Sequence, residues 1–178
     1  SCFLTPNDQS AFTYPPSLKP EVRAWVPGEF LLDVPNFRAD DEAHVLADIH
    51  RLADQHFEVI RRLLARERYD FFMAVDVGTD RIQHRFWHYM DPLHPRHEPG
   101  SAFEHAIHDY YVHLDGLIGS TLELVPDETV VFVVSDHGAQ AMAGGFAINE
   151  WLREDGFLVT DAYPAEAQPL SRAGVAWD

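Results

Sequence analysis

Four residues of the sequence have types and spacings that suit divalent-metal chemistry. Asp80 and His84 stand four positions apart where a helix is predicted to begin, so both side chains project from one face of that helix. A carboxylate and an imidazole spaced in this way can bind one ion, and their donor atoms suit zinc, manganese or iron. The pair alone also has an ordinary explanation, in which Asp80 caps the helix and His84 lies on the surface.

Asp136 and His137 form a second pair directly after the apolar run Val130–Val134. Neighbouring residues at a strand end can bind one ion once the backbone leaves the extended conformation, and Gly138 permits such a turn. The alternative is a plain turn in which Asp136 bonds to nearby backbone amides. Two Asp/His pairs at two predicted strand ends are much harder to explain by these ordinary roles together than either pair is alone.

The segments around these pairs predict an α/β fold with a mainly parallel sheet flanked by helices. The predicted helices span residues 41–67, 80–90, 102–124 and 148–154, and the predicted strands span residues 69–77, 129–134 and 157–160. The first two strands are nearly unbroken apolar runs, which are typical of strands buried on both faces. Ligands lie beyond the carboxyl ends of the strands in such sheets. Both Asp/His pairs fall there, so we expect them to share one edge of the sheet.

Residues 1–40 differ from the rest of the chain because they hold six of the 12 prolines. Proline lacks a backbone donor and resists regular structure. We therefore expect an irregular segment here, forming part of a cap or a linker. The α/β portion is expected over residues 41–178, with Asp40 or Asp41 as the N-cap of its first helix.

The composition narrows the partners and the compartment. The length of 178 residues suits one domain, and a formal charge of −16 argues against a nucleic-acid polymer or an anionic membrane as partner. A small phosphorylated substrate remains compatible, because bound cations can reverse the local field. Cys2 is the only cysteine and no stretch approaches the ~20 apolar residues of a membrane span, so we expect a cytoplasmic protein. Since the sequence begins at Ser1 without methionine, we also expect a segment of a longer protein.

Two motifs carry a resemblance to a known family. Residues 77–87, with the sequence VGTDRIQHRFW, and residues 133–138, with the sequence VVSDHG, resemble the alkaline phosphatase superfamily. The most similar branch is the type I phosphodiesterase/nucleotide pyrophosphatase group of phosphohydrolases and phosphomutases. The resemblance covers about residues 41–160. It implies an alkaline phosphatase-like fold, of which residues 41–178 would form an incomplete catalytic domain.

The resemblance also implies roles for the two pairs. Asp80 and His84 match two ligands of one metal, and Asp136 and His137 match two ligands of a second. The expected cofactors are two divalent ions, zinc first, with manganese or iron as alternatives. The implied activity is hydrolysis of phosphoric esters of the phosphodiester or nucleotide pyrophosphate type.

Four further residues are weaker candidates. Asp76 is a candidate to support a ligand histidine, although a plain strand-end acid explains it equally well. His88 continues the face of Asp80 and His84 and is a candidate substrate contact. Arg81 and Arg85 are candidate phosphate contacts.

The sequence also departs from the family pattern. The Thr or Ser nucleophile and a further Asp ligand are expected upstream, but no catalytic residue is identified in this chain, and no histidine follows His137. We expect the missing groups from the remaining part of the same polypeptide, and little or no turnover by these residues alone. A phosphomutase and a non-catalytic metal-binding or interaction domain are the alternatives. The substrate and the oligomeric state stay open.

Overall fold

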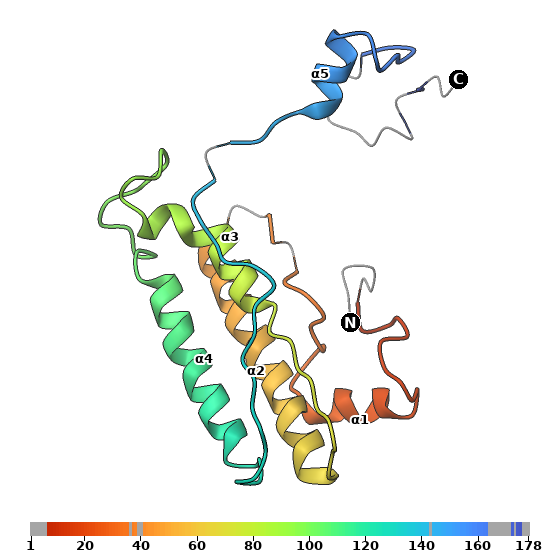
Figure 1. Ribbon diagram of the computed structural model, residues 1–178, viewed down its shortest axis with the longest axis vertical. Helices are drawn as coiled ribbons and strands as arrows, with labels where there is room; N and C mark the ends of the chain where they lie inside the picture. The colour runs from red at the N-terminus through yellow and green to blue at the C-terminus, as the bar shows by residue number, and fades with distance from the viewer. Residues whose placement is uncertain are drawn as a thin grey trace. The chain divides into compact units, whose positions relative to one another are not determined.

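The computed structural model describes residues 7–35, 37–38, 41–142, 144–163, 172, 174 and 175. The chain divides into two units, residues 1–141 and residues 142–178. In the described part of the first unit lie α1 (Leu18–Trp25), α2 (Glu42–Arg66), α3 (Gly78–Met90) and α4 (Ala106–Leu122) (Figure 1). The second unit contains α5 (Ile148–Glu154).

Helix α2 is the element against which the other helices of the first unit pack. The side chain of Asp41 accepts a hydrogen bond from the His44 amide at 3.0 Å, which caps the helix as predicted. Val45, Ile49 and Leu52 then recur at helical spacing and are fully buried. The prediction of a helix over residues 41–67 is therefore confirmed.

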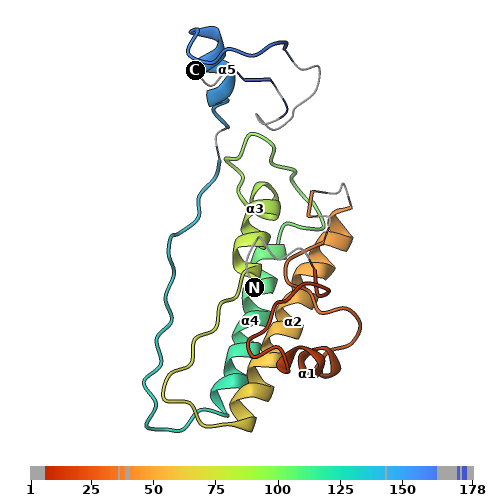
Figure 2. The ribbon, with the colours of Figure 1, turned by 90° about the vertical axis from the view of Figure 1, so that its right-hand side faces the viewer.

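One apolar core joins α2, α3 and α4, which run side by side in the two views of the ribbon (Figures 1 and 2). Helix α3 contributes Ile82 and Phe86 to this core, and α4 contributes Tyr110 and Leu114. Burying a side chain of this size stabilises the fold by about 1.5–3 kcal/mol. The core therefore fixes the rotation of α3 about its own axis, and with it the face on which the candidate ligands lie.

Helix α1 was not predicted, because it lies in the proline-rich segment. Pro20 occupies its first turn, where the missing amide donor has no intrahelical acceptor to lose. Val22 is buried in a second apolar cluster together with Val26 and Phe30. Proline content alone thus suggested less regular structure than this segment has.

A buried glutamine of α2 anchors the chain that follows α1. Gln55 is 2% exposed, and its Oε1 accepts a hydrogen bond from the Leu31 amide at 2.8 Å. Its Nε2 donates to the carbonyl oxygens of Pro27 and Glu29 at 3.1 and 3.0 Å. Nε2 of the next residue, His56, lies 2.8 Å from the Leu31 carbonyl oxygen. These contacts hold residues 27–31 in a defined position beside α2.

The predicted mainly parallel sheet is wrong for the described part of the chain. Residues 69–77 and 129–134 are drawn-out segments that run in the same direction along the bundle, but neither forms a strand (Figures 1 and 2). Among the described residues, the backbone–backbone hydrogen bonds of these segments are local, from the Thr129 amide to the Pro126 carbonyl and from the Arg81 amide to the Val77 carbonyl. Phe71 and Val133 are 80% and 85% exposed. Apolar and β-branched residues favour extended backbone, but a strand also needs a neighbour for its amides and carbonyls. The described residues supply none.

The second unit also lacks the predicted strand at residues 157–160. The amides of Phe157 and Leu158 both donate to the Leu152 carbonyl, at 2.8 and 3.0 Å, so this segment folds back on the end of α5. Thr160 makes one isolated antiparallel bridge with Val175. Helix α5 itself matches its predicted range.

Gly78 gives a test of the packing between α3 and α4. A Cβ atom at Gly78 would overlap the Tyr110 hydroxyl, whereas Gly116 in α4 has open space around the same position. We expect Gly78→Ala to destabilise the protein by about 1–3 kcal/mol, because the buried tyrosine must move. Gly116→Ala should instead stabilise it by about 0.5–1 kcal/mol through helix propensity. Urea unfolding of both variants checks this, and equal effects would contradict the close approach.

His56 makes a prediction about pH. Burial lowers its pKa, and the hydrogen bond to the Leu31 carbonyl only partly opposes this, so the imidazole is neutral in the folded state. The unfolded chain binds the extra proton as the pH falls through about 6.5, so stability should fall between about pH 7 and pH 5. His56→Gln removes this titration, and urea unfolding should show a pH slope smaller by up to about 1.4 kcal/mol per pH unit. An unchanged slope would contradict the assignment.

Candidate metal site at the start of helix α3

Asp76 fixes the position at which α3 begins. Its carboxylate accepts hydrogen bonds from the amides of Gly78 and Thr79 at 3.2 and 3.0 Å, and from the Tyr110 hydroxyl of α4 at 3.1 Å. Burial raises the pKa of Tyr110, and the negative charge of Asp76 raises it further, so the phenol remains a donor. Asp76 therefore ties the first turn of α3 to α4. Its predicted support of a ligand histidine stays a prediction.

Asp80 and His84 lie one turn apart on α3 with their donor atoms facing each other. Asp80 Oδ1 is 3.2 Å from His84 Nε2, and the two side chains are 31% and 53% exposed. Two ligands of one tetrahedral zinc ion, at bond lengths of about 2.0–2.2 Å, have donor atoms about 3.3–3.6 Å apart, so the observed 3.2 Å lies close to the short end of this range. The separation and the donor types fit a shared divalent ion.

Arg81 holds the second oxygen of Asp80. Its Nη1 lies 2.5 Å from Asp80 Oδ2, while Nε and Nη2 donate to the two oxygens of Asp33 at 2.7 and 2.6 Å. The Arg81 side chain is only 10% exposed. The hydrogen bond with Asp33 raises the pKa of Arg81, so its charge is permanent. Asp33 belongs to the proline-rich segment, and no local pattern in the sequence linked it to this site.

Asp136 and His137 lie on an exposed turn. Their side chains are 89% and 68% exposed, and Asp136 Oδ2 is 3.8 Å from His137 Nε2, which exceeds the separation expected for two ligands of one ion. Asp136 Oδ1 accepts a hydrogen bond from the His137 amide at 3.1 Å, and His137 Nδ1 lies 2.8 Å from the Gly138 carbonyl. This pair must change side-chain conformation to bind one ion together.

The charge of Asp80 links the two pairs. The hydrogen bond to the Gly138 carbonyl raises the pKa of His137 most, Asp136 raises it next, and Asp80 adds to the effect from α3. Even so, no group of three or more His, Cys, Asp or Glu side chains could hold a metal ion in the part of the chain that the structure describes. The site contains pairs of candidate ligands rather than a complete set.

Comparison with known proteins gives the chain a family. The family model of type I phosphodiesterase / nucleotide pyrophosphatase matches residues 7–176. The chain belongs to this family. The match supports a phosphoester hydrolase at the family level, and the family is in general metal-dependent. The comparison with curated proteins and the comparison with solved structures each gave no match.

The phosphodiesterase family match includes the proline-rich segment from residue 7 onward, so it extends beyond the resemblance seen at residues 41–160. The helix that carries Asp80 and the segment that carries Asp33 thus both lie inside the matched range. Across the described residues, no helix is long and apolar enough to cross a bilayer.

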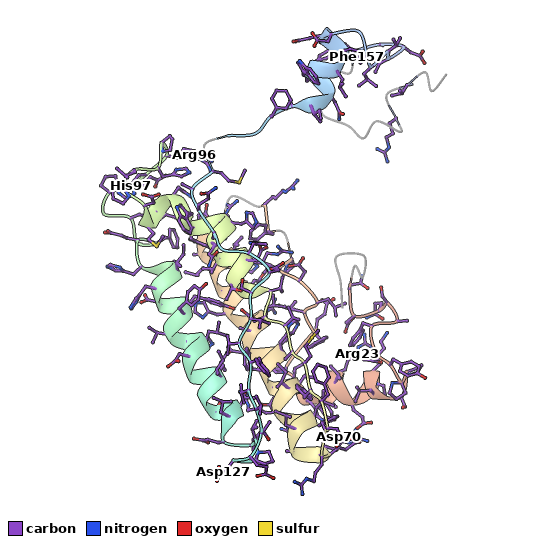
Figure 3. The ribbon with its side chains drawn as sticks, viewed as in Figure 1. Arg23, Asp70, Arg96, His97, Asp127 and Phe157 are labelled. Carbon is purple, nitrogen blue, oxygen red and sulfur yellow. The ribbon has the colours of Figure 1, made fainter. Side chains whose placement is uncertain are left out.

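The remaining candidates of this phosphodiesterase-family chain lie further along α3. Arg85 Nε makes an ion pair with Glu42 Oε2 of α2 at 2.6 Å. Burial lowers the pKa of His88, and the nearby charge of Arg96 lowers it further. Figure 3 shows Arg96 and His97 beyond the end of α3, where His97 Nδ1 lies 3.1 Å from the His88 carbonyl. The substrate contacts assigned to Arg81, Arg85 and His88 stay predictions.

Asp76 and Tyr110 give a test of how the start of α3 is held. Tyr110→Phe should cost about 0.5–1.5 kcal/mol, and Asp76→Ala about 1–3 kcal/mol because it leaves the buried phenol without an acceptor. The double variant should lose clearly less than the sum of the two, since it removes both partners. Tyr111→Phe, at an exposed hydroxyl that accepts from Gln83 at 2.6 Å, is the control and should change little. Urea unfolding measures all four, and additive losses would refute the coupling.

Proposed function

We propose that this chain supplies part of a two-ion site for the hydrolysis of small phosphoric esters of the phosphodiester or nucleotide pyrophosphate type. Asp80 and His84 would hold one ion, and Asp136 and His137 the other. Zinc suits these oxygen and nitrogen donors, with manganese or iron as alternatives. The proposal rests on the 3.2 Å separation of Asp80 Oδ1 and His84 Nε2 within a chain of this family.

The residues of the chain prepare the site for cations. Two divalent ions, when bound, stabilise the attacking and leaving oxygens of an in-line displacement. Asp80 sits in the first turn of α3, which Asp76 holds in place, and His84 presents Nε2 one turn later. The carboxylates of the two pairs bring negative charge that offsets part of the charge of the ions. An anionic substrate can then bind to an otherwise acidic chain.

We propose that the nucleophile comes from the remaining part of the same polypeptide, because the hydroxyl groups beside the two pairs, those of Thr79 and Ser135, donate to backbone carbonyls. Thr79 Oγ1 donates to the Asp76 carbonyl at 3.3 Å, and Ser135 Oγ donates to the His137 carbonyl at 2.5 Å. A nucleophilic hydroxyl needs a base that takes its proton or a metal that lowers its pKa, and a backbone carbonyl does neither. These contacts support a structural role for both hydroxyls.

Metal titration tests the proposal without needing turnover. Isothermal titration with Zn²⁺ should show binding to the chain, weakened by at least about tenfold in Asp80→Ala and in His84→Ala. His108→Ala is the matched control, because His108 Nδ1 lies 3.0 Å from Asp109 in an exposed His/Asp pair outside the site. Equal losses in the control, or unchanged binding in Asp80→Ala, would contradict the ligand assignment.

A second experiment tests the Asp136/His137 pair by measuring hydrolysis of bis-(p-nitrophenyl) phosphate by the full polypeptide. We expect Asp136→Ala and His137→Ala to abolish activity there, while His108→Ala retains it. Retained activity and metal content in both site variants would reject this pair as ligands. Phosphoryl transfer to a second substrate instead of water would favour the phosphomutase.

A further inference from the structure

The guanidinium of Arg81 lies between two carboxylates that come from distant parts of the sequence. It binds both oxygens of Asp33, 48 positions earlier, and one oxygen of Asp80, its own neighbour. The ring of Phe37 lies 5.5 Å from the guanidinium carbon and covers one side of it. The guanidinium is therefore held in one orientation beside a candidate metal ligand.

In this arrangement each oxygen of the Asp80 carboxylate faces a different side chain. Oδ2 faces Arg81 at 2.5 Å, and Oδ1 faces His84 Nε2 at 3.2 Å. A carboxylate that rotates freely would lose conformational freedom on binding an ion, and a held one loses less. Arg81 thus prepares Asp80, but its positive charge would also repel a divalent ion.

Asp33 removes that conflict. Its carboxylate accepts two hydrogen bonds from Arg81 and neutralises the charge of the guanidinium, which a neutral hydrogen-bond acceptor could not do. Burial works to raise the pKa of Asp33, but the hydrogen bonds from Arg81 and from the Val34 amide outweigh it and lower the pKa overall. The carboxylate is therefore ionised at neutral pH.

Asp33 does not depend on Asp80 for its position. Its Oδ1 accepts a hydrogen bond from the Val34 amide at 2.8 Å. Two residues earlier, Leu31 is held at its amide by Gln55 and at its carbonyl by His56, each at 2.8 Å. Helix α2 therefore holds the backbone at Leu31, two residues before Asp33, and so positions the Asp33 carboxylate that accepts hydrogen bonds from Arg81.

We propose that Asp33 is a positioning residue of the metal site. Arg81 orients the Asp80 carboxylate, and the negative charge of Asp33 offsets the positive charge of Arg81, which would otherwise repel the metal ion. This inference rests on the proposed function, because it takes Asp80 as a ligand. It assigns to the proline-rich segment a direct part in divalent-ion affinity.

An ordinary ion pair between α3 and α2 supplies the matched control. Arg85 Nε pairs with Glu42 Oε2 at 2.6 Å, and these side chains are 20% and 21% exposed. Glu42→Gln removes the carboxylate of α2 that pairs with a different arginine of α3, and it leaves Asp80, His84 and Arg81 unchanged.

Zn²⁺ titration of the full chain by calorimetry tests the inference. Asp33→Asn should weaken binding about tenfold, as the loss of an outer partner of a ligand does, because the negative charge of Asp33 no longer offsets Arg81 beside Asp80. The double variant Asp33→Asn/Arg81→Gln removes the positive charge beside Asp80 as well, and its Zn²⁺ affinity should return to within about threefold of wild type. Glu42→Gln should bind as wild type does, and circular dichroism should show every variant folded.

The outcomes separate the two proposals. If wild type binds Zn²⁺ through Asp80 but Asp33→Asn binds equally well, the counter-charge role is wrong. A double variant no tighter than Asp33→Asn, or itself about tenfold weaker than wild type, overturns it too, even if the single variant does not fold. If Asp80→Ala leaves Zn²⁺ binding unchanged, the metal assignment fails and the inference fails with it.

Discussion

The first turn of α3 is the point on which the arrangement of the candidate site depends. Asp76 accepts hydrogen bonds from two amides of that turn and from the buried Tyr110 hydroxyl, so one carboxylate joins α3 to α4. Gly78 permits this because it has no Cβ to meet the tyrosine. With the start of the helix fixed here and Ile82 packed in the core, the direction of Asp80 follows from helix geometry.

The two arginines of α3 each form ion pairs with carboxylates. Arg81 is paired with Asp33 and Asp80, and Arg85 is paired with Glu42. These partners come from the proline-rich segment, from α3 itself and from α2. Arg81 binds Oδ2 of Asp80, and Oδ1 of the same carboxylate faces Nε2 of His84. A compensated cation can orient a ligand carboxylate with little cost to its attraction for a metal.

The proline-rich segment belongs structurally to the helical bundle. Gln55 and His56 of α2 make hydrogen bonds with the backbone of this segment at Leu31. Val22 is buried in an apolar cluster, and the Asp33 carboxylate accepts a hydrogen bond from Arg81 of α3. The family match over residues 7–176 includes it as well. By contrast, residues 69–77 and 129–134 make no backbone ladder among the described residues, although they are the most apolar runs of the chain. Apolar character therefore did not decide which segments are packed.

The sequence by itself determined the local features of this protein. Helical periodicity and the Asp41 cap located α2, and the four-residue spacing placed Asp80 and His84 on one face. Tertiary structure decided the rest. Whether an apolar run becomes a strand depends on a neighbour for its backbone groups, which no property of the run encodes. The Arg81–Asp33 pair spans 48 positions and the Tyr110–Asp76 bond spans 34, so only the packing of α2, α3 and α4 brings them together.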